Sequence, residues 1–316
     1  MAQSLFKRLK ADAPDLYLAV LAPAWSEALL ARMPQVDEPI VMPVGHKQVQ
    51  LGARWRLAQA LKHKHFDQAI LLPGSLKSAL IPFFAGIPTR TGFIGEQRYG
   101  LLNDWRKLDK IALPLNVERF LVLGSAEHRL PDEIPKPALQ VDMDGQVAVQ
   151  RNYSLDANRP LLALCPGAEF GPAKQWPAKH YASVARKKLD DGWQVALLGS
   201  AADNSICAEI NVACEGLCQD LSGLTSLTEV IDILSLTDYV VSNDSGLMHI
   251  AAALERPLVA IYGSSSPDFT PPLSDNCHML KMNLDCQPCF KRECPLGHSN
   301  CLYDLLPERI LAEISS

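Results

Sequence analysis

The chain has 316 residues, of which 48% are apolar and 21% charged, and its net charge is −5 from 30 basic and 35 acidic groups. This length predicts about two domains, and the composition predicts a buried core in each, which excludes a mostly disordered chain. The lack of a basic excess excludes bulk electrostatic binding of nucleic acid. The first ten residues lack the apolar core of a secretion signal, and no apolar run approaches the roughly 20 residues of a membrane span. A cytoplasmic protein is expected.

The first half of the chain alternates apolar runs with amphipathic stretches. Strands are predicted at 16–22, 68–72 and 89–94. Helices are predicted at 2–10, 54–63, 76–85 and 115–125. A helix at the very start is unusual, because α/β domains more often open with a strand. The proline-rich and polar stretches that follow place a linker within 131–158, so we divide the chain into domains 1–150 and 151–316.

The second half shows the same alternation more regularly. Strands are predicted at 160–165, 193–198, 239–242 and 258–262. Helices are predicted at 179–190, 204–214, 227–234 and 246–254. Nearly continuous apolar strands separated by helices are typical of parallel sheets covered on both faces. The sequence therefore predicts two doubly wound α/β domains with a cleft between them, and ligands are expected at the carboxyl ends of the strands.

Two loops at predicted strand ends carry polar chemistry. The loop CPGAEFGPAKQWP at 165–177 combines glycines, which let a backbone approach a ligand, with Lys174, which can neutralise a phosphate. A proline-rich surface turn is an equally acceptable reading of this loop. After the next strand, Asp203 can accept hydrogen bonds from ribose hydroxyls. It can also cap the following helix, and the spacing alone favours the cap.

A third loop, SNDSGLMH at 242–249, joins a buried strand to a helix. Asp244 or Ser245 can cap this helix, and Gly246 lets a ligand approach its free N–H groups, which form an anion site. His249 lies four residues after Ser245 on the same helix face. The alternative is a capped helix whose histidine forms its hydrogen bonds within the protein. The convergence of these side chains at one strand end favours a functional site over this alternative. No P-loop, Gly-x-Ser-x-Gly elbow or Gly-x-Gly-x-x-Gly turn is present.

Cysteines gather near the end of the chain, at Cys286, Cys289, Cys294 and Cys301. A C-x2-C pair followed by two more cysteines predicts a structural zinc site, with His278 and His298 as further ligand candidates. Reduced thiols under a loop, or disulfides formed after isolation, are the alternatives. The remaining cysteines in the middle of the chain are expected to be buried reduced thiols, at Cys165, Cys207, Cys214 and Cys218.

Cationic side chains of the first half form a second group of candidates. Lys77 lies in the segment PGSLKS, which follows a predicted strand and starts a helix. Arg90, Arg98 and Arg106 lie nearby in sequence. We expect Lys77, Arg90 and Arg98 to line the cleft and meet an acidic acceptor molecule. A solvated basic face is the alternative.

Long segments of the chain resemble the bacterial heptosyltransferases, family 9 of the GT-B glycosyltransferases. The segments are PGSLKSAL, AGIPTRTGFIGEQRYGLLND, PGAEFGPAKQWP, SNDSGLMHIAAAL and RPLVAIYGSSSPDFTPPL. The resemblance implies two Rossmann-like domains, of which the second holds ADP-L-glycero-D-manno-heptose and the first meets the acceptor. It implies inverting transfer of heptose to the first heptose of the Kdo2-lipid A inner core, at the cytoplasmic face of the inner membrane, with no cofactor required.

The resemblance also implies a role for each matching residue. Lys174 binds the donor diphosphate, Asp203 lies near the ribose, and Thr225 lines the adenine pocket. The motif formed by Asp244, Ser245, Gly246 and His249 holds the heptose and the phosphates. Lys174 and His249 are then the catalytic residues of this chain, because cleavage of the anomeric bond leaves extra negative charge on ADP.

Members of this family begin with a strand and a Gly-Asp loop, whose aspartate is the proposed general base. This chain begins just beyond that loop, so we expect the strand, the loop and the base to be absent. General-base catalysis typically contributes about 10²–10⁴-fold. A catalytically inactive ADP-sugar-binding protein is therefore the alternative function, and a metal or redox module built on the cysteines is a third.

Overall fold

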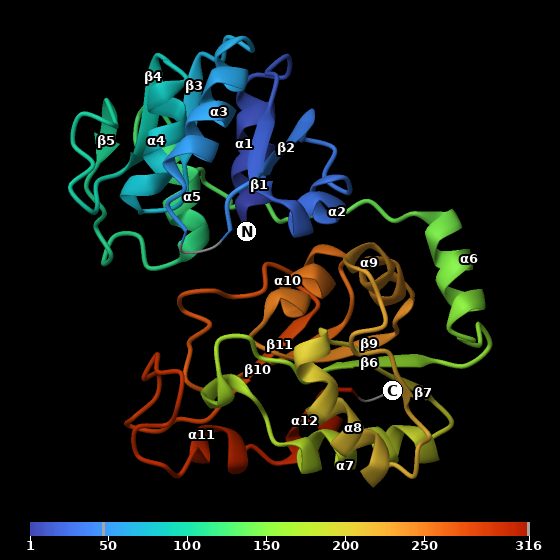
Figure 1. The fold of residues 1–316 in the computed structure, drawn as a ribbon. Helices are drawn as coiled ribbons and strands as arrows, with labels where there is room; N and C mark the ends of the chain where they lie inside the picture. The colour runs from blue at the N-terminus through green and yellow to red at the C-terminus, as the bar shows by residue number, and fades with distance from the viewer. Residues whose placement is uncertain (46–47, 315–316) are drawn as a thin grey trace. The chain divides into compact units, whose positions relative to one another are not determined.

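The computed structural model describes residues 1–45 and 48–314, which fold into two compact units, Met1–Pro135 and Lys136–Ser316 (Figure 1). The division falls inside the predicted linker but earlier than the predicted boundary. Residues 136–150, which the sequence assigned to the first domain, belong to the second unit. No helix in the described ranges is both long and apolar enough to cross a bilayer.

The first unit contains parallel strands in two separate sheets. One sheet pairs β1 (Ala19–Pro23) with β2 (Glu38–Met42), and the other has the order β3 (Gln68–Leu71), β4 (Thr89–Phe93), β5 (Asp104–Arg106). The helices are α1 (Ala2–Asp12), α2 (Glu27–Leu30), α3 (Leu51–Lys62), α4 (Leu76–Phe84) and α5 (Asn116–Gly124). The predicted elements are therefore confirmed, while β2, β5 and α2 are additions.

Helices cover both faces of these strands. Side chains of α3 and α4 pack with Leu21 and Ile40 on one face. Side chains of α1 and α5 pack with Val20 and Ile70 on the other face, so that β1 contributes alternate residues to two cores. The helix α1 is buried through Leu5, which lies so close to Gly124 of α5 that a Cβ on this glycine would overlap it. The predicted helix at the start of the chain is thus part of the core.

The second unit has one parallel sheet of six strands in the order β11-β10-β9-β6-β7-β8. The strands are β6 (Leu161–Cys165), β7 (Gln194–Leu197), β8 (Gln219–Asp220), β9 (Tyr239–Asn243), β10 (Leu258–Tyr262) and β11 (Cys277–Lys281). The helices are α6 (Met143–Asn152), α7 (Ala178–Asp190), α8 (Asn204–Ala213), α9 (Leu227–Leu236), α10 (Gly246–Ala253), α11 (Asn300–Tyr303) and α12 (Pro307–Glu313). In Figure 1, α9 and α10 lie on one face of this sheet, and α7, α8 and α12 on the other. The predicted doubly wound α/β class is confirmed.

Helix α6 occupies a segment that the sequence suggested was a polar linker. Asp142 caps it by accepting hydrogen bonds from the Asp144 and Gly145 amides. Its one buried side chain is Val149, which explains why no helical periodicity was visible. Polar contacts hold α6 on α9, such as the 2.8 Å hydrogen bond from Gln146 Nε2 to Ser235 Oγ. This helix is therefore stabilised by tertiary contacts and not by an apolar pattern that could be recognised in the sequence.

The strand order of the second unit places β6 at a point where the chain direction across the sheet reverses. From β6, the chain runs through β7 and β8 toward one edge, and then returns to β9, β10 and β11 on the other side. The loops that follow β6 and β9 therefore diverge. Open α/β sheets bind ligands in the crevice at such a switch point.

Candidate active site

Lys174 and Asp244 meet at this switch point. Lys174 ends a short 3-10 turn, Pro172–Lys174, in the loop after β6, and Asp244 follows β9 directly. The Lys174 ammonium donates a hydrogen bond to Asp244 Oδ2 at 2.5 Å. The lysine side chain is 18% exposed and the aspartate side chain 5% exposed. An ammonium has three donors, so a buried ion pair that uses one of them keeps the cation oriented while donors remain for a ligand.

Asn243, the last residue of β9, ties the two loops together. It is fully buried. Its Oδ1 accepts a hydrogen bond from the Trp176 amide at 3.1 Å, and its Nδ2 donates to the Pro166 carbonyl at 2.8 Å. These bonds join the end of β9 to both ends of the loop that carries Lys174. The position of the ammonium is thereby set before any ligand binds.

Helix α10 begins two residues after Asp244. Ser245 is its N-cap and forms no side-chain capping hydrogen bond to the helix; its hydroxyl lies 3.2 Å from Ser242 Oγ. Gly246 is exposed, and the space around its Cα is open enough that an added Cβ would meet nothing within 4 Å. The start of α10 is therefore open, two residues after the aspartate that pairs with the Lys174 ammonium. A helix N-terminus next to a cation is suited to bind an anion such as a diphosphate.

His249 lies one turn into α10, and burial lowers the pKa of its imidazole to about 4, while the Asp244 carboxylate acts in the opposite direction. The side chain is therefore neutral near pH 7. A neutral imidazole has one N–H donor and one acceptor nitrogen, so it can hydrogen bond to a ligand hydroxyl without adding charge to the site.

The lowered pKa predicts a pH dependence of stability. An unfolded histidine has a pKa of about 6.5, so at lower pH the unfolded chain binds a proton that the folded chain excludes. The contribution of His249 is present above about pH 6.5 and is lost as the pH falls toward 4. We expect the melting temperature of a His249→Gln variant to fall less than that of the parent chain between pH 7 and pH 5, measured by circular dichroism. Parallel curves for the two proteins would contradict this.

Asp203 and Thr225 lie farther along the same row of strand ends. The Asp203 carboxylate accepts hydrogen bonds from the Ser200 amide and hydroxyl, both at 2.8 Å. It makes no capping hydrogen bond to α8, so the prediction that its side chain caps the following helix is wrong. The same carboxylate lies close to Gly167 in the loop after β6. A Cβ atom added to this glycine would stand only 2.6 Å from Asp203 Cγ. Thr225 Oγ1 lies 3.5 Å from the Leu221 carbonyl, in the loop after β8. The candidates of the second half thus follow the carboxyl edge of β9, β6, β7 and β8.

Two further residues at Lys174 were not predicted. The Lys174 ammonium lies 5.2 Å from the centre of the Phe170 ring, and the Arg292 guanidinium lies 5.4 Å from the same ring. Gly171 has a φ of +145°, and a Cβ there would stand 2.6 Å from the Arg292 carbonyl. The glycine therefore allows the cysteine-rich segment to approach and brings a second cation beside the loop. Residues so far apart in sequence give no local signal of this contact.

The predicted zinc site is not supported. Within residues 1–45 and 48–314, no group of three or more His, Cys, Asp or Glu side chains is arranged to hold a metal ion. All the cysteines in this range are free, including the four of the cluster, Cys286, Cys289, Cys294 and Cys301. His298 Nδ1 accepts the Asn300 amide at 3.0 Å, and His278 Nδ1 lies 2.7 Å from Glu313. The prediction of buried reduced thiols in the middle of the chain is confirmed.

The cysteine-rich segment instead packs against the loop after β10. Gln287 Nε2 donates hydrogen bonds to the Tyr262 and Gly263 carbonyls at 2.9 and 2.7 Å. The Phe290 amide donates to the Ser264 carbonyl at 2.7 Å. Main-chain and amide contacts therefore hold this segment, and the spacing of its cysteines alone could not show that.

The cationic candidates of the first unit are engaged in its own loops. Arg98 is 1% exposed and donates to the carbonyls of Pro73, Ser75 and Phe93. Arg90 donates to the Leu101 carbonyl at 2.7 Å. These guanidiniums connect loops within the unit, whereas Lys77 is half-buried on the first turn of α4.

Comparisons with known proteins agree with this geometry. The profile of glycosyltransferase family 9 (heptosyltransferase) matches residues 54–300. Lipopolysaccharide heptosyltransferase 2 of Salmonella typhimurium (strain LT2) is 47% identical, over all of this chain and 94% of that protein. Its Escherichia coli (strain K12) counterpart is 46% identical, with the same coverage. The structure of E. coli ADP-heptose lps heptosyltransferase II superposes with a TM-score of 0.88 at 44% identity, over 99% of this chain and 92% of that one.

The expectation of a truncated chain finds no support in these alignments. Every residue of the chain is aligned with both curated relatives, and the aligned region covers 94% of each. The α1 helix at the start of the given sequence is a buried part of the first unit.

Proposed function

Since the chain belongs to glycosyltransferase family 9, the heptosyltransferases, we propose that it transfers L-glycero-D-manno-heptose from ADP-heptose to the first heptose of the Kdo2-lipid A inner core. Its activity is heptosyl transfer in the biosynthesis of the lipopolysaccharide core. The precise donor and acceptor are our proposal, and so is inversion at the anomeric carbon. The acceptor is a membrane lipid, so the protein would work in peripheral contact with the cytoplasmic face of the inner membrane.

The observation that carries the proposal is the Lys174–Asp244 pair at the start of α10. When the bond between the anomeric carbon and the phosphate oxygen breaks, the ADP leaving group gains negative charge. We assign the diphosphate to a position where it would accept hydrogen bonds from the Lys174 ammonium and from the first amides of α10. Such preorganised positive charge stabilises the transition state more than the ground state, because the charge on ADP grows as the bond breaks.

The remaining candidates fit the other parts of the donor. The loops after β7 and β8 are joined by the hydrogen bond from the Gly223 amide to the Gly199 carbonyl at 3.0 Å. We assign the ribose to Asp203 and the adenine to the region of Thr225, since these lie progressively farther from Lys174 along the strand ends. Neutral His249 is assigned to hydroxyls of the heptose and to the phosphates.

A direct transfer assay tests the proposal. The full chain is incubated with ADP-heptose and heptosyl-Kdo2-lipid A, and the product is identified by mass and by the configuration of the new linkage. An acceptor heavier by one heptose, with inverted configuration, is expected. Binding of ADP-heptose without any transfer would identify an inactive ADP-sugar-binding protein and refute the proposal.

The same assay tests whether transfer requires a metal ion. Because Lys174 and the N-terminus of α10 supply the positive charge for the leaving group, we expect the transfer rate in EDTA to remain within about twofold of the rate without it. Matched reactions with added Mg²⁺ are the control. A rate that collapses in EDTA and returns with Mg²⁺ would show that the diphosphate needs a metal ion.

A further inference from the structure

Helices α3 and α4 of the first unit expose apolar side chains next to one another. On α3, Leu51 is 58% exposed and Trp55, one turn later, is 50% exposed. On α4, Phe83 is 41% exposed. The centre of the Phe84 ring lies 5.1 Å from that of Trp55 and 5.6 Å from that of Phe83. In Figure 1 the two helices lie side by side along the strands, so these side chains form one patch, which we call the α3–α4 face.

The core of the unit does not require these exposed side chains. Both helices already pack on β1 and β2 through other side chains, because Ala58, Leu61 and Ile81 are buried in contact with Leu21 and Ile40. The α3–α4 face therefore keeps apolar area in water, which is unfavourable. Contiguous exposed apolar patches mark surfaces that contact a partner or a membrane.

The segment that contains both helices is strongly basic. Residues 39–95 include seven lysines and arginines and one acid, Asp67, which gives a net charge of +6 in a chain whose net charge is −5. Neither α3 nor α4 contains an acidic residue. A surface region with one sign of charge attracts partners of the opposite sign.

Cations lie beside the exposed rings. Lys62 is on the same side of α3 as Trp55, two turns later, and Arg56 follows Trp55 directly. Both cations are exposed, and neither forms an ion pair with a residue that the structure describes. The Arg90 guanidinium lies 5.5 Å from the centre of the Phe83 ring, and its hydrogen bonds go to main-chain carbonyls, which leave its charge in place.

The nearest acids in the sequence do not neutralise these cations. Glu38 forms an ion pair with Lys64 at 2.6 Å. The Glu96 carboxylate accepts a hydrogen bond from the Leu76 amide at 2.7 Å. Asp67 precedes β3 and forms no ion pair within residues 1–45 and 48–314. Arg56 and Lys62 are therefore available to anionic groups of a partner.

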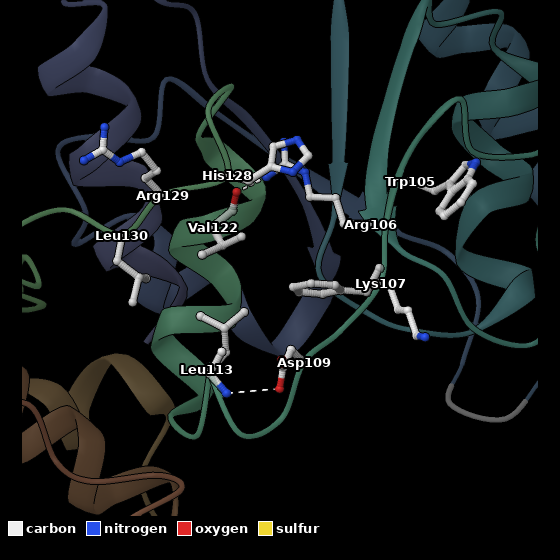
Figure 2. A pocket seen from close by; sticks show the side chains of 11 residues that line it. Trp105, Arg106, Lys107, Asp109, Leu113, Val122, His128, Arg129 and Leu130 are labelled. Atoms are coloured by element: carbon white, nitrogen blue, oxygen red, sulfur yellow. Dashed lines mark hydrogen bonds between the residues drawn. The ribbon is translucent and has the colours of Figure 1, made fainter.

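Figure 2 shows another apolar surface of the same unit, a pocket of about 590 Å³ beside β5 and α5. Trp105 in its lining is 51% exposed. The cations of this pocket lie next to carboxylates, since Arg106 is 3.5 Å from Asp104 and Arg129 is 3.4 Å from Glu127. An exposed ring is thus common to both surfaces, and the excess of positive charge belongs to the α3–α4 face.

We propose that the α3–α4 face docks the protein on an anionic lipid bilayer. Arg56 and Lys62 contact the headgroup phosphates, while the rings of Trp55 and Phe83 enter the interfacial layer. Aromatic rings flanked by long cationic side chains suit this layer, because the rings reach the edge of the acyl chains while the cations stay among the headgroups. The choice of a bilayer as the partner rests on the proposed function, whose acceptor is a membrane lipid.

Removal of charge tests the docking. The full chain is sedimented with phosphatidylcholine vesicles that contain or lack phosphatidylglycerol. We expect the parent to bind the anionic vesicles at least about tenfold more tightly, and the double variant Arg56→Gln with Lys62→Gln to lose about tenfold or more of this affinity, since each cation near such a surface contributes about fivefold. The matched control is Lys107→Gln with Arg129→Gln, which removes two exposed cations that lie beside carboxylates and should change binding by less than about twofold.

The aromatic part of the face has a control of the same kind. Trp55→Ala removes a ring that is 50% exposed, and Trp105→Ala removes a ring that is 51% exposed beside the pocket. We expect Trp55→Ala to weaken binding to the anionic vesicles by about fivefold or more, and Trp105→Ala by less than about twofold. Equal losses for the two variants would overturn the assignment of docking to this face.

Transfer assays separate docking from recognition of the acceptor. Heptosyl-Kdo2-lipid A is presented either in micelles of a neutral detergent or in the anionic vesicles. The double variant Arg56→Gln with Lys62→Gln should keep the parent's KM for the acceptor in micelles and show a KM higher by about fivefold or more in vesicles. An equal rise in both would show that the face binds the acceptor itself, which would overturn its assignment to the bilayer.

Failure of this inference is distinct from failure of the proposed function. If the parent transfers heptose in micelles but does not prefer anionic vesicles, the docking proposal is wrong, and an acidic protein becomes the partner that fits the face. If the parent binds anionic vesicles through the α3–α4 face but transfers no heptose in either form, the proposed function is wrong and the docking surface stands.

Discussion

Replacing Lys174 with alanine is expected to lower kcat by about 10²–10³-fold, the range seen when one preorganised donor to a developing negative charge is removed. The ammonium lies at the N-terminus of α10, beside the position that we assign to the donor diphosphate. Charge on ADP grows as the anomeric bond breaks, so the loss should fall mainly on kcat and less on the KM for ADP-heptose. Steady-state transfer rates over a range of donor concentrations provide the measurement.

The control for this prediction uses the partner carboxylate. Lys174→Ala leaves the Asp244 side chain, which is 5% exposed, buried without its cation. Local disruption could therefore lower activity for a structural reason. In the double variant Lys174→Ala with Asp244→Asn, the unpaired charge is gone. If the ammonium acts on the leaving group, the double variant stays as slow as Lys174→Ala. Recovery of activity would mean that the lysine only neutralises Asp244.

Asn243→Leu is expected to lower the free energy of unfolding of the second unit by about 2–6 kcal/mol, because two buried backbone groups lose their partner and each costs about 1–3 kcal/mol. These groups are the Trp176 amide and the Pro166 carbonyl. Leucine has a similar volume but no polar atom, so the effect reports hydrogen bonding rather than a cavity. Urea denaturation followed by tryptophan fluorescence measures the change.

The matched control is Asn276→Leu, which places the same residue at an exposed position of the same unit. Surface substitutions of this kind usually change stability by no more than about 0.5 kcal/mol. Asn243→Leu should also reduce transfer under conditions where the variant is still folded, because the loop that carries Lys174 loses its attachment to β9. Unchanged stability together with unchanged transfer would show that this side chain does not hold the loop.

Predictions made from the sequence were accurate where local pattern and tertiary role coincide. β6 and β10 are apolar along their whole length because both faces of the sheet are covered, and the sequence shows this directly. The sequence makes the loops after β6 and β9 candidates for ligand binding, with a surface turn and a capped helix as the alternatives. Lys174 and Asp244 stand 70 residues apart in sequence and meet because parallel strands end at the same edge of the sheet.

Other features depend on neighbours that no local pattern reveals. Helix α6 buries one side chain and is held by polar contacts with α9, so its segment resembles a linker. The cysteine spacing suggests a zinc site, yet the segment is held by the hydrogen bonds of Gln287 and Phe290. Arg98 is a surface cation by composition and an internal connector of loops in the structure.

The sequence by itself determined the α/β class, the family and the loops that carry the candidate donor site, because strand burial and helix starts leave local signatures. Only the tertiary structure decided which groups each charged side chain contacts. It pairs Lys174 with Asp244, brings Arg292 to Phe170, engages Arg90 and Arg98 within their own loops, and surrounds an apolar pocket with Arg106, Lys107 and Arg129. A cation's role depends on the groups that surround it in space, and that surrounding exists only after the chain has folded.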